Sequence, residues 1–318
     1  MTKSGALSSI FGAAVSARNK LYDRGLLNQQ RLRGPVLSVG NIAVGGAGKT
    51  PFVIMLGQLL KEQHIRFDVL SRGYGRKTRG VYLVNPEGSA ADFGDEPLLI
   101  SRKLGVPVIV GESRYDAGIY ADQHFGPQLH VLDDGFQHRQ LSRDYDIVLL
   151  TPSDASDRLL PSGRLREPVS ALHRADAVVL TPGTSREGLP LEGKLVLEVK
   201  RDIALSNVPP HPIAFCGIAR PENFFRQLCE HGVEIAAEVS FRDHHSYSRE
   251  DIATLVEKAN ANRAGGFVTT EKDAINLGTL ADGLRPLCSV PATMRLLNAQ
   301  QAVAQILATI AERYRPPA

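Results

Sequence analysis

The chain has no tryptophan and only three cysteines, and aromatic residues make up just 6% of its 318 residues. Cys216, Cys229 and Cys288 are odd in number and widely spaced, so we expect free thiols in a reducing compartment, without disulfides or a zinc site. No apolar run is long enough to span a bilayer, and no secretory signal is expected. A hydrophobic content of 43% with 22% charged residues is typical of a globular protein with a sizeable core.

The chain also lacks a strong excess of charge of either sign. Its formal net charge is +3 and its pI is about 8.7, a mild basicity that permits an anionic partner without identifying one. The length suffices for two domains. Three prolines within residues 207–212 indicate the boundary. We therefore expect one domain at residues 1–205 and a smaller one at residues 206–318, whose final helix packs back on the first.

Strands and helices alternate along both halves of the chain. This alternation predicts the α/β class, with parallel sheets in two α/β units. Expected strands lie at residues 36–39, 67–70, 81–84, 106–110, 130–133, 147–150, 177–180, 195–199, 213–216, 233–239 and 267–270.

A glycine-rich loop between a buried strand and an apolar helix is the first strong functional signal. The strand is expected at residues 36–39 and the helix at residues 50–62, with Gly-Gly-Ala-Gly-Lys-Thr at positions 45–50. Glycines let backbone N–H groups point at an anion, and the helix N-terminus adds its positive dipole end. Lys49 would reach the β- and γ-phosphates of a nucleotide, and the Thr50 hydroxyl would hold Mg²⁺.

The loop departs from the strict phosphate-loop pattern at one position. That pattern asks for glycine at position 43, where this chain has Ala43. The alternative is an ordinary strand-to-helix turn with a lysine at the helix start, but such a cluster of glycines rarely arises for packing alone. We therefore expect a phosphate site here.

A second signal lies at the end of another apolar strand, where Asp133 and Asp134 precede a glycine. An apolar strand that ends in aspartate is the Walker B arrangement, whose carboxylate holds Mg²⁺ or its waters. An Asp-Asp-Gly sequence can also form a hairpin turn. Downstream of a phosphate loop, the metal interpretation is favoured.

Two other residues have competing interpretations. Asp95 lies just before an expected helix with Pro97 near its start, and this position by itself favours an N-cap. His244 follows an expected strand, and sites in open α/β sheets lie at the carboxyl ends of strands. A lone histidine is more often structural, so the two interpretations of His244 are evenly balanced.

Two basic stretches are candidate contacts for anions. Residues 71–77 follow an expected strand and would lie near the phosphates, although a solvated basic loop is the commoner outcome. Residues 5–24 form an amphipathic pattern with a basic border. Such a helix can lie on an anionic membrane surface or pack on the domain core, and the pattern favours neither.

Together these motifs resemble one family closely, the tetraacyldisaccharide 4′-kinases, which are the lipid A 4′-kinases of Gram-negative bacteria. The resemblance covers nearly the whole chain, and the order and spacing of the motifs make it specific. Ala47 stands where the family usually has threonine, and at Ala43 the family also lacks glycine. The matching stretches are residues 39–51, 71–76, 94–97, 133–138, 163–168, 243–245 and 270–273.

The resemblance implies a fold and a reaction. Two α/β/α domains, the first a P-loop sheet, would be joined by a strand linker with ATP in the cleft. With Mg²⁺, the enzyme would phosphorylate the 4′-hydroxyl of a tetraacyldisaccharide 1-phosphate to form lipid IVA, a step of lipid A biosynthesis. Its partners would be this lipid and an anionic membrane surface, with no nucleic acid. Its location would be peripheral, at the cytoplasmic face of the inner membrane, with the N-terminal helix at the bilayer.

The resemblance also implies roles for single residues. Asp95 resembles the catalytic base, assisted by His244, and Lys49 belongs to the catalytic set. The implied metal contacts are Thr50, Asp133, Asp134 and Glu167. The implied nucleotide contacts are Val44, Gly45, Gly46, Ala47, Gly48, Lys49, Thr50 and Pro51. Candidates for contacts to the transferring phosphate or to the lipid phosphate are Arg72, Arg76 and Arg166, because guanidinium forks suit phosphate oxygens. His138 is a further candidate contact to the substrate or its phosphate.

Two other functions fit parts of the sequence. One is a P-loop ATPase that switches a partner protein, but such proteins often carry a signature lysine near the start of the loop, which this chain lacks. The other is a non-enzymatic, nucleotide-binding membrane adaptor. Release of ADP separates the three, because a kinase needs its acceptor, a switch ATPase needs a protein, and an adaptor releases none.

Overall fold

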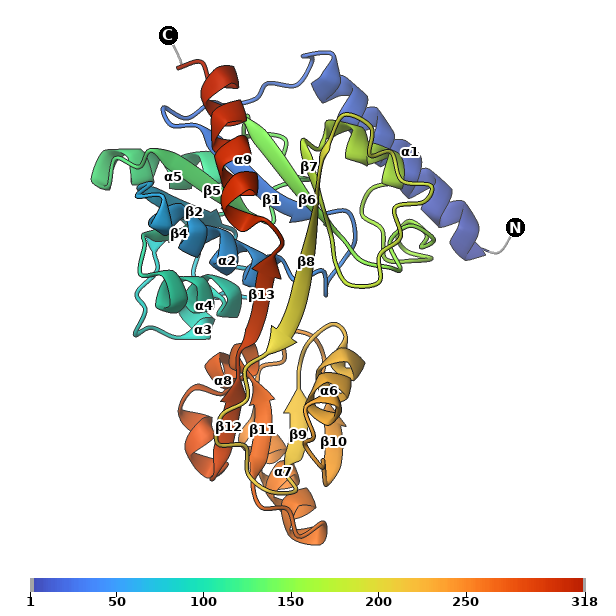
Figure 1. Cartoon of the computed structure of the whole chain (residues 1–318), viewed down its shortest axis with the longest axis vertical. Helices are drawn as coiled ribbons and strands as arrows, with labels where there is room; N and C mark the ends of the chain where they lie inside the picture. Colours follow the sequence, from blue (N-terminus) through green and yellow to red (C-terminus); the bar gives the residue numbers. More distant parts are fainter. Residues whose placement is uncertain (1–2, 317–318) are drawn as a thin grey trace.

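The computed structural model describes residues 3–316, which form two sheets (Figure 1). The larger sheet has nine strands in the order β13-β8-β7-β6-β1-β5-β2-β4-β3. Neighbouring strands from β8 to β4 are parallel, and the edge strands β13 and β3 are antiparallel to their neighbours. The strands are β1 (Val36–Asn41), β2 (Phe67–Ser71), β3 (Tyr82–Leu83), β4 (Val108–Val110), β5 (Leu129–Asp133), β6 (Tyr145–Leu150), β7 (Ala177–Leu180), β8 (Leu195–Ile203) and β13 (Ala292–Leu296).

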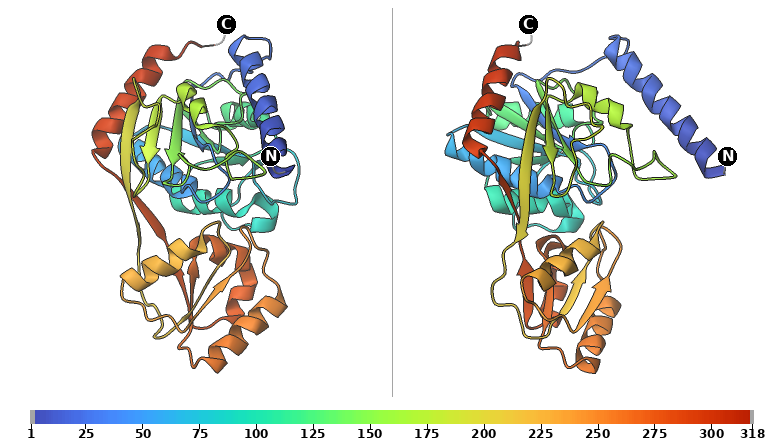
Figure 2. Two further views of the ribbon diagram at one scale, coloured as in Figure 1. Left: turned by 90° about the vertical axis from the view of Figure 1, so that its right-hand side faces the viewer. Right: turned by 45° about the vertical axis from the view of Figure 1, so that its right-hand side comes forward.

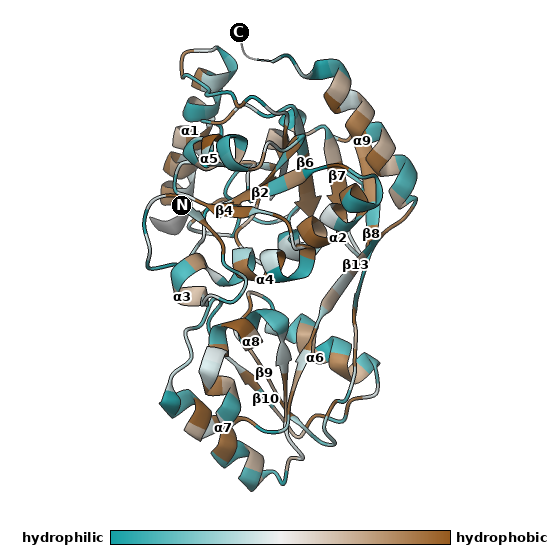
Figure 3. Cartoon of the chain, turned by 90° about the vertical axis from the view of Figure 1, so that its left-hand side faces the viewer, coloured by the Kyte–Doolittle hydropathy of each residue, from teal (hydrophilic) through white to brown (hydrophobic). Residues whose placement is uncertain are grey.

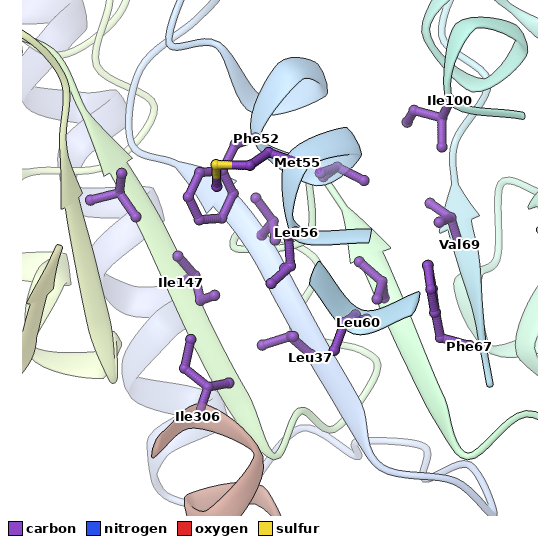
Figure 4. Close-up of a cluster of buried hydrophobic side chains, with 14 of the residues drawn as sticks. Leu37, Phe52, Met55, Leu56, Leu60, Phe67, Val69, Ile100, Ile147 and Ile306 are labelled. Atoms are coloured by element: carbon purple, nitrogen blue, oxygen red, sulfur yellow. The ribbon is translucent and has the colours of Figure 1, made fainter. Parts of the chain in front are cut away.

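Helices cover both faces of the larger sheet, and this explains why its central strands are buried along their whole length. Every residue of β1 is buried, as expected for a parallel strand between two helical layers. On one face, Leu37, Leu56, Ile147 and Ile306 belong to a single buried cluster (Figure 4). The helices of this unit are α2 (Lys49–Glu62), α3 (Ala90–Phe93), α4 (Asp95–Leu104), α5 (Arg114–His124), the 3₁₀ helix η1 (Val169–Arg174) and α9 (Ala299–Arg313).

The smaller sheet has four parallel strands in the order β10-β9-β11-β12. The strand expected at residues 233–239 begins later, at Ala237, because the Val233 N–H group donates to the Leu228 carbonyl (3.0 Å) and closes the end of α6. The elements are β9 (Ile213–Cys216), α6 (Pro221–Glu230), β10 (Ala237–Ser240), α7 (Arg249–Ala261), β11 (Phe267–Thr270), α8 (Glu271–Leu277), the 3₁₀ helix η2 (Gly278–Gly283) and β12 (Leu287–Val290).

The chain passes between the two sheets on a pair of long strands. β8 leaves the larger sheet, and β13 returns beside it in antiparallel pairing (Figure 1). α9 then packs on the larger sheet, where Val303, Ile306 and Ile310 join the core. The sequence division at position 206 counted residues 292–296 with the smaller domain, whereas as β13 they pair with β8 of the larger sheet. The final helix, expected to pack back on the first domain, contributes to the core of the larger unit.

Helix α1 (Lys3–Asp23) runs along one side of the larger unit (Figure 2). The Ser8 hydroxyl on its inner side donates to the Ser162 hydroxyl at 2.7 Å, and Tyr22 is buried. Its outer side exposes 55% of Leu7, 67% of Ile10 and 41% of Leu21. Apolar residues gather in the strands of the larger sheet, and further ones lie along α1 (Figure 3). None of the helices in residues 3–316 combines the length and the hydrophobicity that a membrane span requires.

Candidate active site between the two sheets

The loop between β1 and α2 has the backbone geometry that an anion site requires. Gly45, Gly46 and Gly48 have φ angles of 67°, 65° and 82°, a region that glycine adopts without strain. Ala43 is not among the positive-φ residues; it is buried and forms a β-bridge with Leu165. The departure from the strict glycine pattern therefore does not strain the loop.

Lys49 and Thr50 begin α2, directly after this loop. The Lys49 ammonium group lies 3.4 Å from Oδ1 of Asn41 and 3.4 Å from Oδ1 of Asp134. Thr50 is buried, and Pro51 lies in the first turn, where a missing N–H group is tolerated. Acceptors at the ends of β1 and β5 thus hold the lysine beside the glycine loop.

Asp134 is bound on both oxygens by cations. The Arg166 guanidinium group donates to them at 2.8 and 3.0 Å, and Lys49 lies 3.4 Å away. Burial opposes ionisation of Asp134, but Lys49 and Arg166 outweigh it and hold the pKa of this carboxyl well below its usual range. Asp134 is therefore an ionised partner for two cations.

Asp133 lies in a different environment, although it is the next residue in sequence. Its Oδ2 accepts a hydrogen bond from the Ser71 hydroxyl at 3.1 Å, and its Oδ1 is buried with no partner. Burial, with the nearby charges of Glu96 and Asp134, raises the pKa of Asp133 to about 7. A divalent cation would supply the missing partner and keep this carboxylate ionised.

The acids of the site do not form a complete metal cage. Within the described part of the chain, no three His, Cys, Asp or Glu side chains are grouped so as to hold a metal ion. Mg²⁺ commonly takes one or two carboxylates and completes its octahedron with waters and substrate phosphates. The Asp133 oxygen and the Thr50 hydroxyl fit this second kind of site.

Asp95 of the larger unit makes a hydrogen bond to the smaller unit. Its carboxylate oxygens lie 2.9 and 3.1 Å from Nδ1 of His244, a residue 149 positions further along the chain. Asn276 of α8 donates to the same carboxylate at 3.0 Å. The N-cap interpretation of Asp95 is wrong, because Asp95 is the first residue inside α4 and Gly94 is the N-cap.

The Asp95 carboxylate is buried and ionised. Burial raises the pKa of Asp95, but the hydrogen bond from His244 and the charge of Lys272 outweigh this effect and lower the pKa below its ordinary value. An ionised carboxylate held by an imidazole can accept a proton from a bound hydroxyl group.

The smaller unit also covers the glycine loop. A β-carbon placed on Gly45 would lie 2.8 Å from Cβ of Ala219, in the turn after β9. From the same turn, Arg220 packs on Gly46 and donates to the Thr151 hydroxyl at 3.1 Å. The glycine loop is therefore contacted by both units.

Glu167 has partners other than the acid pair. Arg174 donates to its two oxygens at 2.8 and 3.0 Å, Asn19 at 2.6 Å and Gln137 at 3.0 Å. Burial opposes ionisation, and Arg174 and Asn19 outweigh it, so the pKa of Glu167 is lowered. The structure joins this carboxylate to α1 and η1, and both of its oxygens already accept side-chain donors.

The four predicted phosphate contacts fall into two groups. Arg166 is bound to Asp134, and Arg76 is bound to Glu112 at 2.8 Å. Arg72 contributes instead to a cationic cluster around His138. Burial first, and then the charges of four arginines, lower the pKa of His138 to about 4; these arginines are Arg114, Arg143, Arg18 and Arg72. This neutral histidine among cations is suited to an anionic group.

Several residues of the site had no role assigned from sequence. Asn41 holds Lys49, Ser71 holds Asp133, and Lys272 and Asn276 reach Asp95 from the smaller unit. Lys272 lies in one of the matching stretches, but its position in that stretch does not indicate its partners. Those partners are identified only by the arrangement of the two sheets, which face each other.

The arrangement defines a class of protein. A glycine loop follows β1, an acid pair ends the adjacent parallel strand β5, and Val39 is paired in register with Asp133. This is the architecture of P-loop nucleotide-binding proteins of the α/β class.

Comparison with known proteins identifies the family within that class. A model of the tetraacyldisaccharide-1-P 4′-kinase family matches residues 5–311. The chain is 51% identical over 317 residues to the tetraacyldisaccharide 4′-kinase of Koribacter versatilis, covering 96% of this chain and 98% of that protein. It is 37% identical over 315 residues to the enzyme of the same name from Geobacter metallireducens, covering 92% and 93%.

A solved structure agrees with this result. The "apo" form of LpxK from Aquifex aeolicus in complex with ATP superposes with a TM-score of 0.76 at 34% identity, covering 96% of this chain and 98% of that one. The chain belongs to the tetraacyldisaccharide-1-P 4′-kinase family. The resemblance seen in the motifs and the predicted α/β class are both confirmed.

The contacts of Glu167 generate a prediction about stability. Glu167→Gln keeps the side-chain volume but removes the charge that neutralises buried Arg174, so the free energy of unfolding should fall by about 3–5 kcal/mol in urea denaturation. In the exposed pair between Arg186 and Glu198 (2.7 Å), Glu198→Gln is the control and should change stability by about 1 kcal/mol at most. Unchanged stability of Glu167→Gln, with a raised Mg²⁺ requirement, would instead support the metal role.

Proposed function

We propose that this protein transfers the γ-phosphate of ATP to the 4′-hydroxyl of a tetraacyldisaccharide 1-phosphate, forming lipid IVA in lipid A biosynthesis. The observation that carries the proposal is the hydrogen bond between Asp95 and His244, assembled from two units beside a phosphate loop. A base shared between two units is present only when the cleft is closed, and this limits hydrolysis of ATP by water. Family membership supports the substrate class.

We assign the nucleotide and its metal to the glycine loop and the acid pair. Lys49 and the loop N–H groups would bind the phosphates, while Thr50 and Asp133 would hold Mg²⁺, which neutralises charge on the transferring group. The unpartnered, buried Oδ1 of Asp133 supports this assignment. Asp134 would keep Lys49 and Arg166 in place, as its contacts indicate. Glu167 is left out of the metal shell, because both of its oxygens accept other donors.

Asp95 would accept the proton of the sugar hydroxyl as its oxygen attacks the γ-phosphorus. The ionised state of the carboxylate and its hydrogen bonds from His244 and Asn276 support this role. In phosphoryl transfer the protein contributes mainly positioning and charge stabilisation. A carboxylate held by two donors from a second unit supplies that positioning.

The cationic cluster around His138 is our candidate for the 1-phosphate of the lipid. The charges of Arg72 (after β2), Arg114 (the start of α5) and Arg18 (α1) all lower the pKa of His138. Guanidinium groups bind phosphate oxygens in pairs. The Arg18 guanidinium group of α1 donates to the carbonyl of Gln137, the neighbour of His138, at 3.3 Å, so an anionic headgroup placed there would lie near the helix that we propose contacts the bilayer.

The outer side of α1 is our candidate membrane contact. Leu7, Ile10 and Leu21 are exposed there on one side of the helix, and Lys20 and Arg24 are exposed near its end. Apolar side chains would enter the headgroup boundary, and each cation near anionic lipid would contribute about 1 kcal/mol, reduced by salt. The attachment would then be peripheral, on the cytoplasmic face of the inner membrane, where the acyl chains of the substrate remain in the bilayer.

The function is tested by ADP release with and without the lipid disaccharide acceptor. The wild type should release ADP in proportion to acceptor and form a product with one additional phosphate. Lys49→Ala should abolish turnover with the fold intact by circular dichroism, because it removes the cation on the phosphates. ADP release that ignores the acceptor, or full activity of Lys49→Ala, would overturn the proposal.

Asp95→Asn tests the base. The amide cannot take the proton, so kcat should fall by about 10²–10⁴-fold while ATP affinity stays near the wild-type value. Asp116 in the first turn of α5 offers a matched control, and Asp116→Asn should keep wild-type kcat. A kcat in Asp95→Asn equal to that of the control would remove the base role from Asp95.

Vesicle binding tests the role of α1. Leu7→Ser with Ile10→Ser removes two exposed side chains, each contributing about 1.5–3 kcal/mol when fully buried, so binding to anionic vesicles should weaken roughly tenfold or more. Activity on detergent-dispersed acceptor should change less. Val15, half-buried on the inner side, gives the control: Val15→Ser should lower the melting temperature instead. Vesicle binding unchanged by the outer substitutions would contradict the membrane role.

A further inference from the structure

Lys272 lies at the centre of the polar contact between the two units. It belongs to the first turn of α8 and its side chain is only 16% exposed. Its Nζ lies 2.9 Å from Oδ1 of Asp243, 3.2 Å from Nε2 of His244 and 3.8 Å from Oδ2 of Asp95. One ammonium group therefore contacts the carboxylate, the imidazole and the residue before the imidazole.

The contact between Lys272 and His244 determines which ring nitrogen carries the proton. An ammonium group has three donors and no acceptor. An imidazolium ring also donates from both nitrogens, so it has no lone pair to receive the Lys272 donor. The neutral ring with its hydrogen on Nδ1 satisfies both contacts, because Nδ1–H donates to Asp95 at 2.9 Å and Nε2 accepts at 3.2 Å.

We propose that Lys272 is a positioning residue for phosphoryl transfer: by donating to Nε2 of His244 and to Asp243, it holds the ring in the neutral form whose Nδ1–H group faces Asp95. The inference rests on the proposed kinase function. Lys272 touches neither the acceptor hydroxyl nor the γ-phosphate in this scheme. It acts through the imidazole and the carboxylate.

The charges around His244 support this arrangement. The groups that face the ring are Asp95 and Glu96 from the larger unit, Asp243 and Lys272 from the smaller one, and the Tyr74 ring at 5.0 Å. Burial lowers the pKa of His244, the bond to Asp95 raises it above its ordinary value, and Lys272 limits that rise. The net direction favours protonation, so the neutral ring is inferred from geometry: at 3.2 Å only a neutral Nε2 can accept a hydrogen bond from the ammonium group.

Lys272 itself is a stable cation. Burial opposes its charge, but Asp95, Glu96 and Asp243 outweigh burial and raise the pKa of Lys272. The same charge helps to lower the pKa of Asp95. Loss of Lys272 should therefore make both Asp95 and His244 easier to protonate.

The bonds, electrons and proton of the phosphoryl-transfer step are all accounted for without a proton from Lys272. The 4′-oxygen forms a bond to the γ-phosphorus, the bond from that phosphorus to the β–γ bridging oxygen breaks, and ADP leaves with those electrons. The hydroxyl proton passes to Asp95. Lys272 exchanges no proton in this step, since its contribution is the orientation of the ring and the charge state of the carboxylate.

The test compares Lys272→Met with a second lysine at the same interface. Lys103 of α4 pairs with Glu271 of α8, the residue next to Lys272; Lys103→Met is therefore a matched loss of one cross-cleft cation. In Lys272→Met, kcat should fall by up to roughly 10²-fold with ATP KM little changed. The acidic limb of the pH profile of kcat should move to higher pH by about 1–3 pH units, because Asp95 loses a neighbouring positive charge. Lys103→Met should keep the wild-type limb, and Lys272→Arg should restore much of it.

Nitrogen-15 NMR of histidine-labelled protein gives a readout independent of activity. The His244 signal, identified by its loss in His244→Gln, should show the Nδ1-protonated neutral ring in the wild type. It should titrate at higher pH in Lys272→Met, or in Lys272→Gln if the methionine variant does not fold. The inference would be overturned if Lys272→Met and Lys272→Gln both kept the wild-type titration of His244 and the wild-type acidic limb of the kcat profile. It would also be overturned if Lys103→Met shifted that limb as far as Lys272→Met does. Absence of acceptor-dependent ADP release in the wild type would overturn the proposed function instead, and the NMR titration would still decide the role of Lys272.

Discussion

The carboxyl ends of the parallel strands in one sheet face those of the other sheet, and the rest of the site depends on this constraint. In the larger sheet the glycine loop follows β1 and Asp133 ends β5. In the smaller sheet Ala219 follows β9, Asp243 follows β10 and Lys272 follows β11. Ligands of open α/β sheets bind at such edges. Here two edges enclose one space, so the cationic and anionic groups of one unit find partners in the other.

The paired strands β8 and β13 explain how this facing is kept. The smaller unit is attached to the larger sheet by two hydrogen-bonded antiparallel strands instead of one. Arg201 of β8 also reaches the Ala47 carbonyl of the glycine loop. The connection is therefore in direct contact with the glycine loop, and Arg220 of the smaller unit packs on the same loop at Gly46.

Much of the fold could be predicted from sequence, because buried parallel strands are short apolar runs and glycine loops have strict local geometry. Contacts between distant segments could not. Asp95 looked like a cap because its partner His244 is far away in sequence, and β13 was missed because an edge strand alternates buried and exposed residues. The motif around Glu167 does not reveal that this carboxylate forms an ion pair with Arg174. The role of Lys272 becomes visible only when α4, which carries Asp95, is seen to lie opposite it.

The return of β13 and α9 to the larger sheet has a consequence for synthesis on the ribosome. The smaller sheet is built from one continuous stretch, β9 to β12. The larger sheet is complete only after β13 and α9, which follow that stretch, have been synthesised. The unit that begins first is thus completed last, contrary to the usual order in which N-terminal domains fold first. Until α9 emerges from the ribosome, the face of the larger sheet that Ile306 and Ile310 cover stays exposed to water.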